Sequence, residues 1–291
     1  MTLALRMFRK VMGMLAAAAI ALAACVAAAA MASNAAAAQD APLVSLDSWG
    51  KSRGWEAVGV LELEGNRRCT GTLIAPDHVL TAAHCVHDPA TGKKTPASSI
   101  VFNAGWRDGR SVAKRRVTAW VIPEGYADAV AQTARQISLD LALLRLDAPI
   151  PATHADPYIT DGAIRPGETV SVVSYGAGRF DAPSRQRACD VTRAYGAVKA
   201  LTCKAVQGSS GSPVFALRGP RPRIVAVVSA IAQSDQGQIT YAMDVEHLVP
   251  RLKARLAAGR SMPVASRNET AVRRITVGGP KSASGARFVK P

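Results

Sequence analysis

The chain has 291 residues, of which 48% are hydrophobic and 20% are charged. This balance is typical of a globular protein and excludes wholesale disorder, a collagen-like rod and a polytopic membrane protein. The 36 Lys and Arg residues exceed the 21 Asp and Glu residues, which gives a formal net charge of +15. Such a charge favours acidic surfaces, lipid head groups or nucleic acid, but it identifies none of them.

Residues 1–38 have the composition of a secretory signal peptide. A positive segment at residues 6–10 precedes an uncharged run over residues 11–32, and small residues at 36–38 are typical of a cleavage site. A retained membrane anchor is the alternative interpretation. The sequence Leu-Ala-Ala-Cys, ending at Cys25, also resembles the lipobox of bacterial lipoproteins. We expect export to the periplasm or the medium, with a lipid anchor on Cys25 as the minor alternative.

Four cysteines follow this segment, namely Cys69, Cys85, Cys189 and Cys203. An even number in an exported chain predicts two disulfides, and three pairings are open. The short pairings, 69–85 and 189–203, would each contribute about 3 kcal/mol in the chain-entropy model. Zinc is the alternative ligand of such cysteines, but the sequence has no C-x-x-C pair or Cys/His ladder. We therefore expect no metal and no other cofactor.

Short β-rich segments, separated by Gly, Pro and other turn residues, begin near residue 54. A turn at residues 64–66 lies between segments 58–61 and 70–74, which predicts a hairpin. Further strands are expected at 79–81, 100–102, 117–122, 141–146, 169–174, 214–217, 224–228 and 239–243. The pattern indicates an all-β fold, an antiparallel sandwich or barrel, and argues against a βαβ fold.

Three other segments differ from the strand pattern. Residues 151–166 contain three prolines and are interpreted as a connector between two β units. Apolar residues over 245–256 recur at helical spacing and predict a helix with Asp244 as N-cap, although Pro250 would let the regular part begin only there. Residues 259–291 are basic and rich in Ser, Gly and Pro, so we expect a solvated tail, with binding to an anionic surface as the alternative.

Three motifs follow one another in the chain. The first is V-L-T-A-A-H-C, which ends at Cys85, the second is D-L-A-L-L-R-L, which begins at Asp140, and the third is G-S-S-G-S-P, which begins at Gly208. Together they resemble the motifs around the catalytic His, Asp and Ser of the trypsin-like (chymotrypsin-fold) serine peptidases, in the same order. The resemblance covers roughly residues 54–258, and the third motif is similar to that of the bacterial branch.

The resemblance implies a triad of Ser210, His84 and Asp140. His84 would take the proton from Ser210, and Asp140 would hold the imidazole in the required tautomer. The backbone N–H groups of Gly208 and Ser210 would form the oxyanion hole. The alternatives outside the motif register are Ser209, the histidines at 78, 87, 154 and 247, and the acids Asp128 and Asp147.

The resemblance also implies two antiparallel six-stranded β-barrels with a C-terminal helix. Residues 54–150 would form the first barrel, and residues 167–258 would form the second barrel and the helix. The active site would lie in the cleft between the barrels. Among the open pairings, we expect Cys69–Cys85 to clamp the loop that presents His84, and Cys189–Cys203 to form the second disulfide.

The sequence says less about substrate specificity than about the triad. By the register of the family, Lys204 lies six residues before the nucleophile, at the base of the pocket for the residue before the cut. A lysine that points inward would select acidic or polar side chains, whereas one that points outward would leave the selection open. Ser229 and Ile231 match the strand that pairs with the substrate backbone, and Ile231 would narrow the pocket. A preference for Arg or Lys is therefore not expected.

We expect an exported, monomeric serine endopeptidase that cleaves polypeptides through an acyl-enzyme and binds no specific nucleic acid. Many animal members have an Asp before the nucleophile that pairs with a new N-terminus after activation cleavage. Here the residue is Ser209, so such a switch is not expected, and a propeptide role for residues 39–53 stays open. The alternatives are a catalytically silent homologue that acts as a binding module and a basic surface-binding protein.

Overall fold

The computed structural model describes residues 41–88, 90–127, 133–235 and 237–260. The expected signal peptide, Cys25 and nearly all of the basic tail lie outside the described residues. So does Asp128, one of the alternative acids. None of the helices in the described ranges combines the length and the apolar character that crossing a membrane requires.

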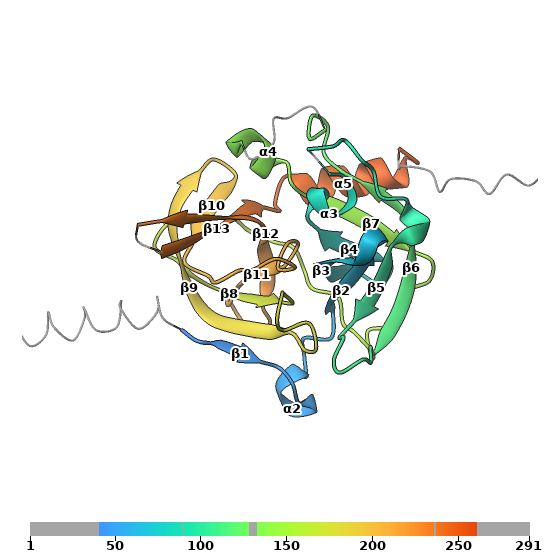
Figure 1. Ribbon diagram of the computed structural model, residues 1–291, viewed down its shortest axis with the longest axis horizontal. Coiled ribbons are helices and arrows are strands. Elements are labelled where there is room, and N and C mark those ends of the chain that lie inside the picture. The colour runs from blue at the N-terminus through green and yellow to red at the C-terminus, as the bar shows by residue number, and fades with distance from the viewer. Residues whose placement is uncertain (1–40, 89, 128–132, 236, 261–291) are drawn as a thin grey trace, which may run out of the picture.

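Six antiparallel strands close the first barrel in the order β2-β3-β4-β7-β6-β5 (Figure 1). They are β2 (Val58–Leu63), β3 (Arg67–Ala75), β4 (His78–Thr81), β5 (Val101–Ala104), β6 (Ala113–Val121) and β7 (Ala142–Leu146). The expected hairpin turn joins β2 to β3 through a short 3-10 turn, Glu64–Asn66. Gly65 and Asn66 have φ values of 74° and 60° there, which glycine and asparagine tolerate better than most residues.

Six further strands form the second barrel beside the first (Figure 1). They are β8 (Thr169–Ser174), β9 (Ser184–Tyr195), β10 (Val198–Leu201), β11 (Pro213–Ala216), β12 (Arg223–Ser234) and β13 (Gly237–Asp244). The order β9-β10-β13-β12-β11-β8 closes through the antiparallel pairing of β8 with β9. The predicted all-β fold of two six-stranded barrels is confirmed. Residues 151–166 connect the barrels without a helix or strand, apart from a single bridge between Thr160 and Ile224.

The sheet of the second barrel contains strands that the hydrophobic pattern did not predict. β9 has the sequence SRQRACDVTRAY, whose many polar residues hide the strand, and its pairing with β8 and β10 decides its structure. An additional strand, β1 (Leu43–Ser45), pairs with the outer edge of β9. Nε2 of the buried Gln186 donates a hydrogen bond to the carbonyl of Ala41 at 3.1 Å, and Leu46 is buried. The segment with an open propeptide role is thus partly built into this sheet.

The longest helix, α5 (Leu248–Ala257), follows the second barrel but packs on β6 and β7 of the first. Arg145 on β7 donates a hydrogen bond to the carbonyl of Leu256 at 2.8 Å. The prediction that Asp244 is the N-cap is wrong, because Asp244 ends β13 and its carboxylate pairs with Lys199 at 2.7 Å. Pro250 lies in the first turn, where its missing N–H is not needed. The shorter helices are α2 (Trp49–Ser52), α3 (Ala83–Val86), α4 (Ala134–Ser138) and a 3-10 turn, Ala97–Ser99.

Candidate active site

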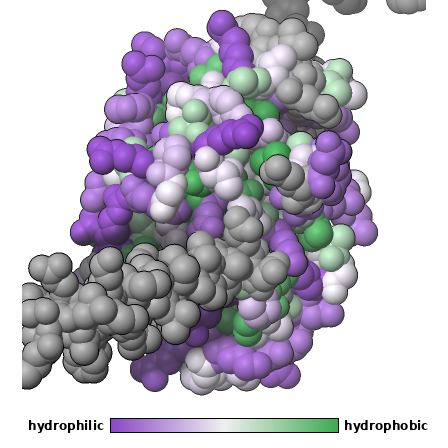
Figure 2. All heavy atoms as spheres, turned by 90° about the vertical axis from the view of Figure 1, so that its left-hand side faces the viewer, coloured by the Kyte–Doolittle hydropathy of each residue, from purple (hydrophilic) through white to green (hydrophobic). Residues whose placement is uncertain are grey.

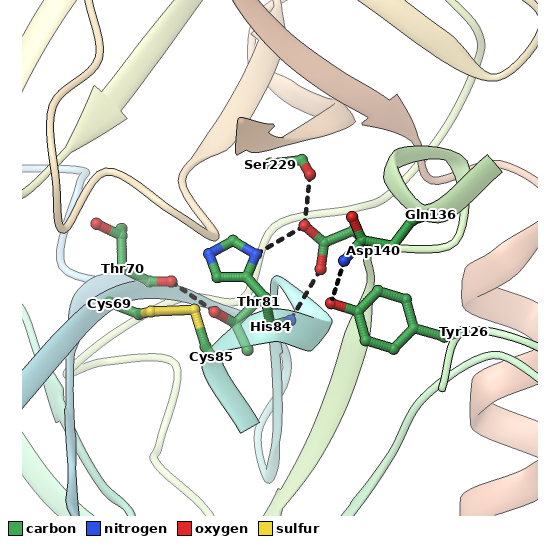
Figure 3. Close-up of polar contacts among 9 residues, drawn as sticks. All are labelled: Cys69, Thr70, Thr81, His84, Cys85, Tyr126, Gln136, Asp140 and Ser229. Atoms are coloured by element: carbon green, nitrogen blue, oxygen red, sulfur yellow. Dashed lines mark hydrogen bonds and ion pairs between the residues drawn. A yellow bond between two sulfur atoms is a disulfide. The ribbon is translucent and has the colours of Figure 1, made fainter. Parts of the chain in front are cut away.

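His84 and Asp140 lie side by side because the strands next to them are neighbours in the first barrel. β4 ends at Thr81 and leads into α3, which carries His84, while Asp140 lies two residues before β7. Thr81 pairs with Ala142 across these two strands. His84 Nδ1 lies 2.7 Å from Asp140 Oδ2, and the backbone N–H of His84 donates to Oδ1 at 2.9 Å (Figure 3). One carboxylate therefore fixes both the ring and the backbone of His84.

A third donor to Asp140 comes from the second barrel. The hydroxyl of Ser229, on β12, donates to Asp140 Oδ2 (Figure 3). Burial alone would raise the pKa of Asp140, which is 2% exposed, but the charge of His84 and the hydrogen bonds from His84 and Ser229 lower it below its usual value. The sequence placed Ser229 only on a substrate-pairing strand. No local signal could link it to Asp140, because the two residues are 89 positions apart.

The imidazole of His84 has a raised pKa. Burial lowers the pKa, but the charge of Asp140 and its hydrogen bond to Nδ1 outweigh that effect. The side chain is 28% exposed, which leaves part of the ring open to the solvent. An imidazole with Nδ1–H held by a carboxylate presents Nε2 as a base.

Two buried polar side chains, those of Gln136 and Tyr126, lie near Asp140. Gln136 lies on α4, just before Asp140, and its Nε2 donates to the hydroxyl of Tyr126 at 3.1 Å (Figure 3). Burial raises the pKa of Tyr126, so this phenol stays neutral. The ring of His87 packs edge-on against Tyr126, with 5.9 Å between the ring centroids. His87 is therefore a buried packing residue, although it is only three positions from His84.

Ser210 lies between β10 and β11, on a loop that β3 of the first barrel holds in place. The hydroxyl of Thr70 donates to the carbonyl of Gly208 at 3.0 Å, and the N–H of Thr70 donates to the carbonyl of Ser210 at 2.9 Å. The same Thr70 hydroxyl accepts from the N–H of Tyr175 at 3.1 Å. One threonine of the first barrel thus sets the position of the loop from the second barrel relative to His84.

Two glycines allow this loop its shape. Gly208 has a φ of +93° and Gly211 a φ of +82°, in the region that favours glycine. A Cβ on Gly208 would overlap the ring of Phe180, and a Cβ on Gly211 would overlap the carbonyl oxygen of Thr70. The glycines of the third motif are required by both backbone conformation and space.

Ser210 and His84 line the same cavity, whose volume is about 600 Å³. In the described part of the chain, the N–H groups of Gly208 and Ser210 have no acceptor, and the Ser210 hydroxyl has no hydrogen-bond partner, His84 included. The arrangement offers a hydroxyl, a base and two unoccupied backbone donors at one cavity. The lining residues are Leu63, Gly65, Asn66, Arg67, Arg68, Cys69, His84, Cys85, Ala177, Phe180, Gln207, Gly208 and Ser210.

Ser209, the alternative to Ser210, has a different environment. It is 1% exposed, and its hydroxyl donates to the carbonyl of Tyr175 at 3.1 Å. The same hydroxyl accepts from Arg179 at 3.0 Å and from the N–H of Val206 at 3.2 Å. A hydroxyl with three partners inside the protein is placed to hold the loop and not to reach a substrate.

The residues that the sequence assigned to specificity do not meet in this cavity. Lys204 is exposed and lines a different cavity, on the side of the second barrel formed by β9, β10, β12 and β13. Its N–H donates to Gln186 Oε1 at 2.7 Å, and Cys203 beside it is tied to Cys189. Of the two positions that the sequence left open for Lys204, the structure has the exposed one. Ile231 is 47% exposed and does not line the cavity of Ser210.

The side of the molecule that carries Lys204 has a polar surface. Figure 2 shows this side of the second barrel, and its visible atoms belong mostly to hydrophilic residues. The cavity there includes Arg193, Tyr195, Tyr241 and Asp235 beside Lys204. These side chains lie outside the cavity that contains His84 and Ser210.

Both expected disulfides are present. Cys69–Cys85 has a Cα–Cα distance of 6.4 Å and joins β3 to α3, next to His84 (Figure 3). Cys189–Cys203 has a Cα–Cα distance of 5.0 Å and joins β9 to the segment after β10. Cys69, Cys85 and His84 form the one potential metal-ligand cluster in the described ranges, and both sulfurs are in the disulfide. That cluster offers no thiolate to a metal.

Comparisons with known proteins agree with this geometry. A family model described as trypsin-like peptidase domain matches residues 69–221, more than half of the chain. Serine protease 23 of Homo sapiens is 30% identical over 169 residues, which are 50% of this chain and 42% of that protein. Serine protease SP24D of Anopheles gambiae is 41% identical over 105 residues, 35% of this chain and 34% of that protein. The chain thus spans less than half the length of these relatives.

Solved structures share the fold at low sequence identity. The structure of Glu endopeptidase in complex with MPD superimposes with a TM-score of 0.60 at 21% identity, over 71% of this chain and 92% of that one. The scabies mite inactivated protease paralogue S-D1 superimposes with a TM-score of 0.56 at 16% identity, over 72% of this chain and 94% of that one. The two-barrel fold therefore occurs in an endopeptidase and in a paralogue described as inactivated.

Proposed function

Because the chain belongs to the trypsin-like peptidase family, we propose that it is a serine endopeptidase with Ser210 as nucleophile, His84 as general base and Asp140 as the residue that orients His84. The observation that supports this most is the pairing of His84 Nδ1 with the buried Asp140 carboxylate at 2.7 Å, because His84 lines the same cavity as Ser210. A serine hydroxyl is a weak nucleophile at neutral pH and needs such a base.

The proposed reaction has two stages. His84 Nε2 takes the proton of Ser210 Oγ as the oxygen attacks the carbonyl carbon of the peptide, and the resulting imidazolium is stabilised by Asp140. The N–H groups of Gly208 and Ser210 stabilise the negative oxygen of the tetrahedral intermediate. His84 then gives its proton to the leaving amine, and a water molecule hydrolyses the acyl-enzyme by the same steps in reverse.

Labelling with a fluorophosphonate probe tests this proposal. The purified mature chain is compared with Ser210→Ala, and Ser209→Ala serves as a control for a neighbouring hydroxyl outside the cavity. We expect covalent labelling of the parent chain and its loss in Ser210→Ala, with a labelled peptide that maps to Ser210. Retention of label in Ser210→Ala, or a label on Ser209, would contradict the assignment.

A catalytically silent binding module is the second candidate. It is favoured by the Ser210 hydroxyl, which makes no hydrogen bond to His84 within the described residues, and by the fold shared with a paralogue described as inactivated. A folded, disulfide-intact chain that takes no label, also after limited proteolysis near residues 39–55, would support it. Catalytic hydrogen bonds often tighten only when substrate binds, so labelling discriminates better than the unliganded geometry.

We also propose that the chain is exported. Two disulfides in the described residues are typical of oxidising compartments such as the periplasm or the extracellular space. Expression with and without residues 1–38, followed by fractionation and an assay of free thiols, tests this. Retention of the full chain in the cytoplasm with all five cysteines as free thiols would contradict it.

A further inference from the structure

The cavity of Ser210 and His84 has a basic end. Arg67 and Arg68, at the start of β3, both line it, and no Asp or Glu is among its lining residues in the described ranges. Both arginines are exposed. A cavity with two cations and no carboxylate favours a negatively charged group.

Arg68 is held close to the loop of the candidate nucleophile. Its Cζ lies 5.2 Å from the centroid of the Phe180 ring, within the range of a cation–π contact. The same ring lies against Gly208, since a Cβ on Gly208 would overlap it. One aromatic ring therefore separates the Arg68 guanidinium from the proposed oxyanion hole. No carboxylate in the described part of the chain pairs with Arg68.

Arg67 is more firmly anchored than Arg68. Its Nη2 donates to the carbonyl of Cys85 at 2.8 Å and, at 3.5 Å, to the hydroxyl of Thr95. It also lies close enough to Asp88 for the two charges to interact, so part of its charge is compensated. Arg68 is therefore the residue with free guanidinium donors, and Arg67 adds to the local positive potential.

The position of the cavity indicates which part of a peptide would reach these arginines. The leaving amine receives its proton from His84, so it lies on the His84 side of the scissile bond. The cavity extends along the Cys69–Cys85 disulfide beside His84 to β3. No residue of β12, the strand with Ser229 and Ile231, lines it. The basic end thus lies on the leaving-group side.

We propose that this cavity binds an acidic side chain of the substrate, one or two residues after the scissile bond, with Arg68 as its main partner. The proposal rests on the proposed endopeptidase function and names the substrate class of that site. An extended peptide advances by about 3.3 Å per residue, so an acid at one of these positions can reach past Phe180 to Arg68. A guanidinium binds a carboxylate through two parallel hydrogen bonds.

Matched internally quenched peptides test the preference. Peptides that differ only in Glu or Gln at the first and second positions after the cut are assayed for kcat/KM. We expect the parent chain to favour Glu by about twofold to fivefold, the upper part of the range for an exposed ion pair. Arg68→Gln should bring the ratio close to one, and Arg68→Glu should favour Lys at the same position. A parent ratio near one, or an unchanged ratio in Arg68→Gln, overturns the proposal.

Arg187→Gln is the matched control. Arg187 lies exposed on β9, outside the cavity, and its removal changes the net charge by the same amount. The Glu preference should persist in this variant. Loss of the preference in Arg187→Gln as well would show a general effect of net charge and would contradict a role for Arg68.

A binding measurement separates this proposal from the proposed function. Ser210→Ala is titrated with fluorescently labelled versions of the Glu and Gln peptides, and fluorescence polarisation is measured. Tighter binding of the Glu peptide that is lost in the Ser210→Ala/Arg68→Gln double variant supports the acidic subsite even if the parent chain takes no fluorophosphonate label. Equal binding of both peptides overturns the subsite and leaves the endopeptidase function to the labelling result.

Discussion

The Arg179 guanidinium donates a hydrogen bond from Nη2 to the hydroxyl of Ser209, the residue before Ser210, at 3.0 Å. Nη2 also donates to Ser174 Oγ at 2.9 Å, and Nη1 donates to the Ser174 carbonyl at 2.6 Å. Burial lowers the pKa of Arg179 to about 10, and no carboxylate in the described ranges pairs with it. Arg179 thus connects β8 to the loop that carries Ser210. Its partner Ser209 is the residue at which the sequence predicts no ion pair.

Loss of this clamp should reduce catalysis more than binding. In Arg179→Ala we expect kcat to fall by about 10- to 100-fold with KM little changed, because a hydrogen bond to a charged group contributes about 1.5–3 kcal/mol. Arg179→Lys should retain part of the rate. Steady-state kinetics and the rate of fluorophosphonate labelling measure this, with the exposed Arg187→Ala as control. An equal loss in the control would contradict a local role.

Activity and stability should depend on pH in opposite directions near neutrality. The raised pKa of His84 means that kcat/KM, which needs neutral His84, should rise with an apparent pKa above the ordinary 6.5. The stability that protonated His84 gains from Asp140 is present below 6.5 and is lost as the pH rises through the raised pKa. A pH–rate profile beside urea unfolding at each pH tests both signs.

The lowered pKa of Asp140 determines how far the pH can fall before the folded protein loses the stabilisation from this carboxylate. Its stabilisation is present above the ordinary value of 3.8 and is lost as the pH falls through the lowered pKa. Asp140→Asn should lower the apparent pKa in the rate profile and reduce kcat by up to about 10⁴-fold, because the amide favours the wrong tautomer of His84. An unchanged rate in Asp140→Asn would contradict the assigned role of Asp140.

Gly211→Ala should destabilise the contact between the barrels. The new Cβ would overlap the carbonyl of Thr70 and the hydroxyl of Thr81, at a φ of +82°. We expect the free energy of unfolding to fall by about 2–4 kcal/mol, from strain and displaced packing together. Gly219→Ala is the control, since Gly219 has a φ of +83° but no atom within 4 Å of its Cβ position. It should cost about 1 kcal/mol, the strain alone. Equal losses in urea unfolding would show that the overlap has no effect.

The two disulfides should contribute equally to stability but unequally to activity. Cys69→Ala/Cys85→Ala and Cys189→Ala/Cys203→Ala open loops with separations of 16 and 14 residues, so each double variant should lose about 3 kcal/mol of stability. Only the first disulfide lies next to His84. At a temperature where both variants are folded, fluorophosphonate labelling should slow more in the first pair. Equal labelling rates would show that Cys69–Cys85 does not position His84.

The short strands, the four cysteines and the three motifs are visible in the sequence because they depend on local properties, whereas the two barrels and the disulfide pairing were expected from the family resemblance that the motifs carry. Strand periodicity, turn residues and the spacing of G-S-S-G-S-P are properties of short segments, and the glycines at 208 and 211 are required wherever that loop forms. The strand β9 escaped prediction because its three arginines and Gln186 hide the alternation, and only its neighbours in the sheet make it a strand.

Which distant residues meet depends on the tertiary structure. Ser229 reaches Asp140 across 89 positions, Thr70 bonds Gly208 across 138, and Arg179 reaches Ser209 across 30. The first two contacts depend on how one barrel packs on the other, and the third depends on how β8 and the loop after β10 lie within the second barrel. No periodicity within a segment encodes either arrangement. The family register likewise could not show that Lys204 is exposed and lines a different cavity of the second barrel.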